Sequence, residues 1–151
     1  MARILSLDVG DKRIGVALSD AGGILASPLT IIERTPSSTD DIEAILKIVQ
    51  ERDVARIIVG LPRLMSGVIG SQAEKVQAFV ESLKPHSNIP VELRDERLTT
   101  VTAVRLKQET ASKKKDRKMR YDAMAAAVIL QDYLEEKNYS KSPTLEKGVY
   151  P

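Results

Sequence analysis

The sequence predicts an α/β fold in which a mixed five-stranded sheet is flanked by helices. Residues 3–9 and 13–19 are short apolar segments rich in branched side chains, and the turn Gly10-Asp11-Lys12 joins them, which is typical of a β-hairpin. Further along, apolar segments of strand length alternate with segments of helical periodicity. That alternation favours parallel strands connected by crossover helices, so the sheet is expected to contain both antiparallel and parallel pairs.

The next two elements are a strand and a helix. Residues 23–32 predict a third strand, which Pro28 weakens because proline cannot donate a hydrogen bond to the sheet. Ser37, Ser38, Thr39 and Asp40 offer N-caps for a helix over about 39–52. Its apolar face would consist of Ile42, Ile45, Leu46 and Val49.

A second strand–helix–strand unit follows. Residues 55–62 form an apolar strand that Gly60 and Pro62 close, and a helix is expected over about 71–84 after an intervening loop. The inward positions of this helix are Ala73, Val76, Phe79, Val80 and Leu83. The last strand, residues 90–94, leads into the charged sequence Asp95-Glu96-Arg97.

The C-terminal third predicts two helices separated by a basic segment. Thr99 or Thr100 can cap a helix that runs to about Glu109, and a final helix is expected from about Arg120 to Glu136. We therefore expect one domain over residues 1–138 and a flexible tail over 139–151.

Composition excludes several classes of protein. The chain has no cysteine, so it has neither disulfides nor thiolate ligands, and its single histidine, His86, lies in a proline-flanked loop sequence. A Ser-His-Asp hydrolase is therefore disfavoured. The N-terminus does not resemble a signal peptide, and no apolar segment approaches the roughly 20 residues of a membrane span. We expect a soluble cytoplasmic protein.

Acidic residues are placed where sites form in such sheets. Asp8 is near the end of the first strand, and Asp95-Glu96 ends the last one. Asp122 begins the final helix, on the same face as Ala125 and Ala126. Each acid alone has an ordinary explanation: a turn residue, a solvated strand end, or a favourable charge at a helix N-terminus. Strand alternation places Asp95 and Glu96 on opposite faces and does not decide between them.

Together, converging carboxylates would repel one another unless they shared cations. Magnesium is the natural choice, since it takes oxygen ligands, and two such ions about 4 Å apart form a phosphodiester-cleaving site. The neighbouring cations Lys12, Arg13 and Arg97 could hold a phosphate backbone.

The strongest cationic feature is KKKDRKMR, residues 113–120. This segment carries +5 while the rest of the chain carries −3, within a net charge of +2. It is either a solvated linker between helices or a grip for the phosphates of a nucleic acid. The cations proposed for that grip are Lys113, Lys114, Lys115, Arg117 and Lys118.

Five sequence motifs resemble, in order, those of the YqgF (RuvX) family. They are LDVGDKRIGVALSD, IVGLPRLMSG, GSQAEKVQAF, DERLTT and YDAMAAAVILQDYL, between about residues 3 and 135. The resemblance implies a ribonuclease-H-like fold related to the resolvase RuvC, and a nuclease that matures the 5′ end of pre-16S rRNA. It also implies that Asp8, Glu96 and Asp122 are the catalytic acids and hold Mg²⁺ or Mn²⁺. Arg63 and Leu64 depart from the more polar loop that the family leads us to expect.

Other functions stay open at this point. The chain could be a Holliday junction resolvase that acts on branched DNA, or a non-catalytic RNA-binding factor of ribosome assembly. DVGDKRIGVA also resembles the first phosphate motif of actin-like ATPases and sugar kinases. Those proteins clamp a nucleotide between two such domains, and 151 residues have room for one. The sequence does not distinguish a monomer from a homodimer.

Overall fold

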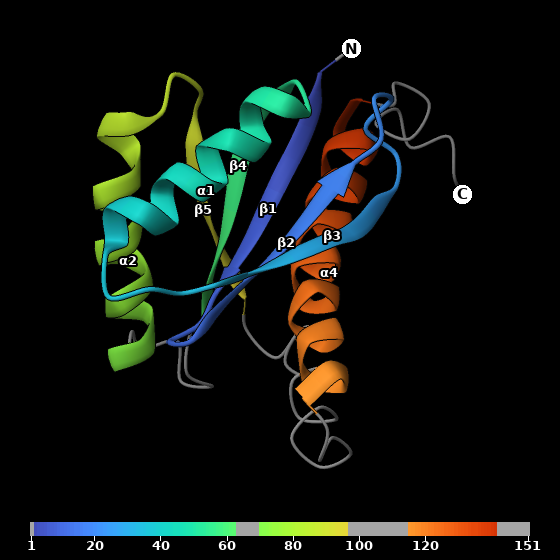
Figure 1. Ribbon diagram of the computed structural model, residues 1–151. Helices are drawn as coiled ribbons and strands as arrows, with labels where there is room; N and C mark the ends of the chain where they lie inside the picture. The colour runs from blue at the N-terminus through green and yellow to red at the C-terminus, as the bar shows by residue number, and fades with distance from the viewer. Residues whose placement is uncertain (1, 63–69, 97–114, 142–151) are drawn as a thin grey trace.

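The computed structural model describes residues 2–62, 70–96 and 115–141 (Figure 1). Five strands form one sheet in the order β3-β2-β1-β4-β5. β1 pairs antiparallel with β2, and β2 with β3, whereas β1–β4 and β4–β5 are parallel. The predicted mixed five-stranded sheet is confirmed. The elements are β1 (Arg3–Val9), β2 (Arg13–Ser19), β3 (Ala26–Glu33), α1 (Ser38–Glu51), β4 (Val54–Pro62), α2 (Ser71–Leu83), η1 (Lys84–His86), β5 (Val91–Glu96) and α4 (Lys115–Lys141).

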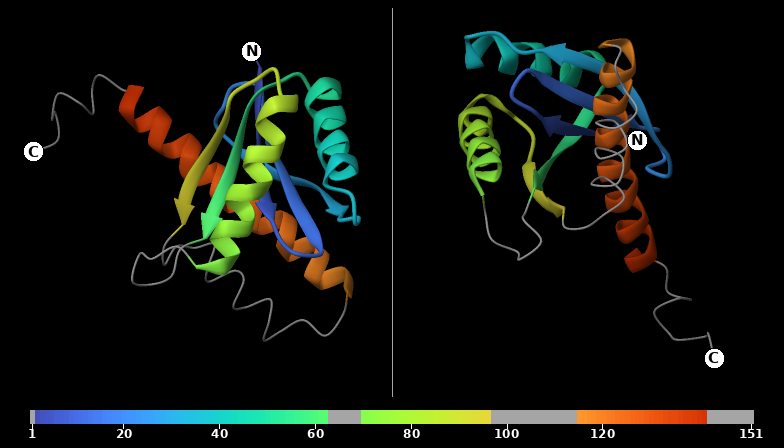
Figure 2. Two further views of the ribbon diagram at one scale, coloured as in Figure 1. Left: turned by 90° about the vertical axis from the view of Figure 1, so that its left-hand side faces the viewer. Right: turned by 90° about the horizontal axis from the view of Figure 1, so that it is seen from below.

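Helices cover both faces of the sheet. α1 and α2 lie on one face and α4 crosses the other, as the two views of Figure 2 show. Leu5, Leu7 and Val9 of β1 join the core that α1 and α2 cover. The second core consists of Ala17, Ile58 and the buried face of α4. Because side chains alternate along a strand, every second residue of β1 faces α4.

The two helices on the first face agree with their predicted patterns. Ser37 caps α1, and its hydroxyl accepts a hydrogen bond from the Asp40 amide at 3.2 Å. Ile42 and Ile45 are buried, and Leu46 and Val49 pack against the same core. All five predicted inward positions of α2 are buried: Ala73, Val76, Phe79, Val80 and Leu83.

Three elements, β3, β5 and α4, differ in extent from the prediction. β3 begins at Ala26, because residues 20–25 form a turn in which the Asp20 carboxylate accepts hydrogen bonds from the amides of Ile24 and Leu25. Pro28 lies at an irregularity in the pairing of β2 and β3, where a missing donor is tolerated. β5 extends beyond the predicted residue 94, because Asp95 and Glu96 pair with Leu61 and Pro62 of β4.

The third difference concerns α4, which begins at Lys115 and ends at Lys141. Most of the basic segment is therefore the start of this helix instead of a linker, and residues 139–141 are helical although they were predicted to lie in the tail. The helix predicted to end near Glu109 lies outside the described residues. Within the described part of the chain, no helix is long and apolar enough to cross a membrane.

Candidate active site

Asp8 lies on the face of β1 that α4 covers. Ser6, two residues earlier on the same face, is fully buried, and its hydroxyl donates a hydrogen bond to the Ala126 carbonyl of α4 at 2.5 Å. Small side chains allow this close approach, since Ala125 and Ala126 are both fully buried. Asp8 itself is half-buried, next to the point where helix and sheet touch.

Both strands beside Asp8 carry a glycine. Gly15 of β2 stands directly opposite Asp8 in the antiparallel pair. On the other side, Leu7 is aligned with Val59, so the next step of the parallel register brings Asp8 level with Gly60. The residues directly beside Asp8 on both neighbouring strands therefore carry no side chain. This feature was not predicted, although the two glycines are visible in the sequence.

The structure separates Asp95 from Glu96 by strand alternation. Arg94 lies on the α4 face, because its guanidinium contacts the Glu136 carboxylate of α4 at 2.6 Å and lies 5.8 Å from the Tyr133 ring centroid. Asp95 therefore belongs to the opposite face, and the backbone position of Glu96 is in phase with Arg94 and with Asp8. Glu96 is aligned with Pro62, at the carboxyl end of β4. The side chain of Glu96 lies outside the described part of the structure.

Asp122 enters this region through the backbone of α4. It is one helical turn before Ala126, a step of about 6 Å, and Asp8 is two strand residues beyond Ser6, a step of about 6.6 Å. Both steps start from the Ser6–Ala126 contact. They lead toward the same end of the sheet, the end at which β1 finishes and α4 starts (Figure 1). The Asp122 side chain is not among those described. The backbone thus brings three acidic positions to one end and one face of the sheet.

Only part of the predicted cationic surface can be located. Lys12 is exposed in the β1–β2 turn, and Arg13 is half-buried at the start of β2, in phase with Ala17 of the α4 face. Lys115, Arg117 and Lys118 belong to the first turns of α4, and nothing is described of their side chains. Arg97, Lys113 and Lys114 lie outside the described residues.

The turn that carries Lys12 is held by residues the sequence analysis did not single out. A Cβ atom on Gly10 would lie 2.9 Å from the Arg13 carbonyl oxygen, so only glycine fits there without a shift. The Arg34 guanidinium donates to the Gly10 carbonyl at 3.0 Å and to the Asp41 carboxylate at 3.3 Å. Only 1% of the Asp41 side chain is exposed, and no pattern in the sequence predicted that this acid would be buried.

The ion pair between Arg94 and Glu136 connects β5 to α4, two residues before Glu96. Arg94 holds the pKa of the Glu136 carboxyl below its usual value, whereas burial raises the pKa of Asp132 one turn earlier on α4. Among the side chains that the structure describes, no three acids or histidines are grouped as metal ligands. Asp8 alone of the three catalytic candidates has a described side chain.

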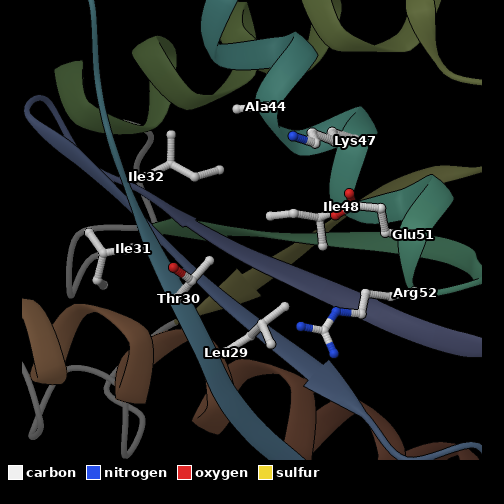
Figure 3. A pocket seen from close by; sticks show the side chains of 9 residues that line it. All are labelled: Leu29, Thr30, Ile31, Ile32, Ala44, Lys47, Ile48, Glu51 and Arg52. Atoms are coloured by element: carbon white, nitrogen blue, oxygen red, sulfur yellow. The ribbon is translucent and has the colours of Figure 1, made fainter.

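A cavity of about 440 Å³ lies elsewhere, between β3 and α1 (Figure 3). Its walls are apolar side chains of both elements with charged groups at the rim. It is lined by Leu29, Thr30, Ile31, Ile32, Ala44, Lys47, Ile48, Glu51 and Arg52. None of the acidic or cationic site candidates lines it, so it is separate from the candidate active site.

Known proteins are similar to this chain in sequence and in fold. A family profile described as "RuvX: Holliday junction resolvase" matches residues 2–136. A relative from Thermoanaerobacter pseudethanolicus, named "Putative pre-16S rRNA nuclease", is 50% identical over 136 residues, 89% of this chain and 97% of its own. A relative of the same name from Roseiflexus sp. is 47% identical over 135 residues, 89% of this chain and 95% of its own.

Solved structures of resolvases have the same fold. Thermus thermophilus RuvC in complex with a Holliday junction superimposes with a TM-score of 0.54 at 16% identity, over 90% of this chain and 96% of that one. The yeast mitochondrial Holliday junction resolvase gives 0.50 at 13% identity, over 93% and 83% of the two chains. At these identities the likeness supports the ribonuclease-H-like fold. With the match over residues 2–136 and the close relatives, it follows that this chain belongs to the RuvX (YqgF) family.

Proposed function

We propose that this protein is a metal-dependent nuclease that hydrolyses phosphodiester bonds and matures the 5′ end of pre-16S rRNA in the cytoplasm. The observation that carries the proposal is the placement of Asp8, Glu96 and Asp122 at one end and on one face of the sheet. Relatives at 47% and 50% identity bear the name of a pre-16S rRNA nuclease, which supports this substrate.

The donor set suits a hard divalent cation. Asp8, Glu96 and Asp122 offer only carboxylate oxygens, and the chain has no cysteine. Its one histidine, His86, precedes β5, whereas Glu96 is at the other end of that strand. Such a set fits Mg²⁺ or Mn²⁺ better than zinc. A pair of these ions, when bound, supplies an activated water and charge stabilisation for the leaving oxygen.

The protein's own residues then position the substrate. Gly15 and Gly60, the residues directly beside Asp8, carry no side chain, which would leave room for a phosphate near the metal that the carboxylate holds. Lys12 and Arg13, at the same end of the sheet, would hold neighbouring phosphates. The cations Arg97, Lys113, Lys114, Lys115, Arg117 and Lys118 would extend this contact along the strand.

A second candidate is a Holliday junction resolvase acting on branched DNA, which the family description and the RuvC-like fold favour. That reaction cuts two strands, so it requires two sites and hence a homodimer. The rRNA reaction requires one cut and is compatible with a monomer. The third candidate, a non-catalytic RNA-binding assembly factor, would bind structured RNA and leave it intact.

The test is cleavage of two substrates by wild type and by single-residue variants. The substrates are an RNA spanning the 5′ end of 16S rRNA with its precursor sequence and a four-way DNA junction, each in Mg²⁺, Mn²⁺, Ca²⁺ or excess chelator. Asp8→Asn, Glu96→Gln and Asp122→Asn should each lower the rate by orders of magnitude while the melting temperature holds or rises, because carboxylate repulsion is relieved. Asp95→Asn, on the opposite face, is the matched control and should cut at the wild-type rate.

Calcium should support cleavage poorly, since its looser coordination misplaces the attacking water. Wild-type rates in all three acid variants would show that the site is elsewhere, and robust cleavage in chelator would exclude the metal mechanism. Preference for the junction over the RNA would favour the resolvase, and binding of RNA without cleavage in any metal would favour the assembly factor.

A further inference from the structure

Arg34 lies where four elements of the fold meet. It directly follows β3, and its guanidinium contacts the β1–β2 turn at the Gly10 carbonyl and α1 at the Asp41 carboxylate. The same group lies 5.1 Å from the ring centroid of Phe79 in α2. Its backbone amide donates to the Lys12 carbonyl at 2.9 Å. One residue thus connects the turn to both helices of that face.

Asp41 holds the Arg34 side chain in this position. Its second oxygen accepts hydrogen bonds from the amide and hydroxyl of Thr35, at 3.0 and 3.1 Å. The carboxylate is 1% exposed and the Arg34 side chain 21% exposed, so water screens their attraction far less than it would at the surface. The guanidinium is therefore restrained by an ion pair, a carbonyl and an aromatic ring, and little rotamer freedom is left to it.

The β1–β2 turn depends on its contacts with Arg34 more than the position of Asp8 does. Asp8 is inside β1, where the pairing with Gly15 of β2 and the adjoining parallel ladder of β4 fix its backbone. Gly10 and Lys12 lie beyond those ladders, and Arg34 binds both of their carbonyl oxygens. Arg34 also approaches from the α1 and α2 face, whereas Asp8 lies on the α4 face.

We propose that Arg34, locked by Asp41, is a positioning residue that fixes the β1–β2 turn so that Lys12 and Arg13 meet the phosphates of the nucleic acid. This inference rests on the proposed function, because it assigns phosphate contacts to that turn. A preorganised pair of cations binds more tightly than a mobile pair of the same charge, since the ordering entropy is already lost before binding. Loss of Arg34 should therefore reduce affinity for the substrate more than it reduces the rate of the bound complex.

Asp41→Asn separates positioning from simple charge. The substitution makes the protein more positive by one charge, so electrostatic attraction alone predicts tighter binding of a polyanion. Loss of the lock predicts the opposite: an affinity weaker by about 3- to 10-fold, in line with removal of one or two well-formed hydrogen bonds. Arg34→Lys should weaken binding similarly, because an ammonium keeps the charge and lacks the planar fork that reaches Asp41 and Gly10 together.

The measurement is fluorescence anisotropy with the labelled precursor RNA in chelator, followed by KM and kcat for cleavage in Mg²⁺. In both variants we expect the dissociation constant and KM to rise while kcat stays within about 3-fold of wild type. The slope of log affinity against log salt should be unchanged in Arg34→Lys, since no cation is removed. Amide hydrogen exchange at residues 10–13 should be faster than in wild type, a readout that needs no substrate.

Arg56→Gln is the matched control. It removes an arginine from another partly exposed ion pair, with Glu92, toward the amino end of β4 and away from the turn. Its affinity should match wild type. The positioning role would be overturned if Asp41→Asn bound the RNA as tightly as wild type or more tightly, and if amide hydrogen exchange at residues 10–13 were unchanged. If wild type itself neither binds nor cuts RNA or DNA, the proposed function fails instead, and the exchange data still report whether Arg34 holds the turn.

Discussion

The separation of Asp8 from Asp122 depends on how closely α4 approaches β1, and Ala126→Leu tests this directly. Ala126 is fully buried, and its carbonyl lies 2.5 Å from the Ser6 hydroxyl. A leucine adds an isopropyl group at a contact that has no spare volume. The helix must move away from the strand, and its first turns, which carry Asp122, must move with it.

The expected loss of activity greatly exceeds the expected loss of stability. Overpacking of a core typically lowers the free energy of unfolding by about 1–3 kcal/mol. Domains of this size have about 5–15 kcal/mol, so even the least favourable combination leaves roughly 97% of the molecules folded at 25 °C. A displacement of about 1 Å between catalytic groups can lower a rate about 100-fold. Unfolding therefore cannot account for a loss of that size.

The assay is single-turnover cleavage at saturating Mg²⁺ and 25 °C, with the melting temperature measured on the same preparations. Met124→Leu is the control on the same helix, since Met124 is 44% exposed and its substitution should change neither quantity. Ser6→Ala removes the hydrogen bond without adding volume, and should lower stability by about 0.5–1.5 kcal/mol with a smaller effect on the rate. An Ala126→Leu protein that folds and cuts at the wild-type rate would refute the argument that this contact sets the acid spacing.

Two further predictions concern charge. Changing Lys113, Lys114 and Lys115 together to alanine should flatten the slope of log affinity against log salt by about two to three units in total, about 0.7–0.9 for each phosphate that is no longer neutralised. Binding to different nucleic-acid sequences should weaken equally. An unchanged slope would leave Lys12, Arg13 and Arg97 as the residues that bind the substrate phosphates. The backbone amides of Ile24 and Leu25 hold the pKa of Asp20 below its usual value. The ionised Asp20 carboxylate therefore stabilises the fold above the ordinary aspartate pKa of about 3.9, and this stabilisation is lost as the pH falls through the lowered pKa. Asp20→Asn should therefore melt below wild type at pH 6, and thermal melts down to pH 2.5 should show that gap closing; a gap of constant size would contradict this reasoning.

Local patterns in the sequence were sufficient for the elements on the α1 and α2 face. Alternating apolar residues marked β1 and β2, a continuous apolar run closed by Gly60 and Pro62 marked β4, and the spacing of Val76, Phe79 and Val80 defined the buried side of α2. These signals survive because burial of one face imposes a period of two on strands and of 3.6 on helices. The start of α4 was predicted too late, because the charges of residues 115–120 suggested a linker although the backbone continues the helix through them.

The candidate acids could be named from their positions in the sequence, since Asp8 is next to the last residue of β1 and Glu96 is the last residue of β5. Asp122 was expected near the start of the final helix and lies two turns inside α4, because that helix begins at Lys115. Which of Asp95 and Glu96 shares a face with Asp8 depended on the pairing of β4 with β5 and on the contact between Arg94 and α4. The surroundings of Asp8 were likewise a tertiary matter, because Gly15 and Gly60 become its neighbours only through strand register.

The contacts of Arg34 that hold the β1–β2 turn could not be predicted from the sequence either, because they also join residues distant in the chain. Arg34 lies 24 residues from Gly10 and 7 from Asp41 along the chain, and both charged residues are of types usually found at the surface. Local propensity acts over a few residues, so the sequence by itself determined the five strands, α1, α2 and the residue types able to hold a metal. Only the folded chain, which pairs residues distant in sequence, decided which acids share a face and what holds the turn beside them.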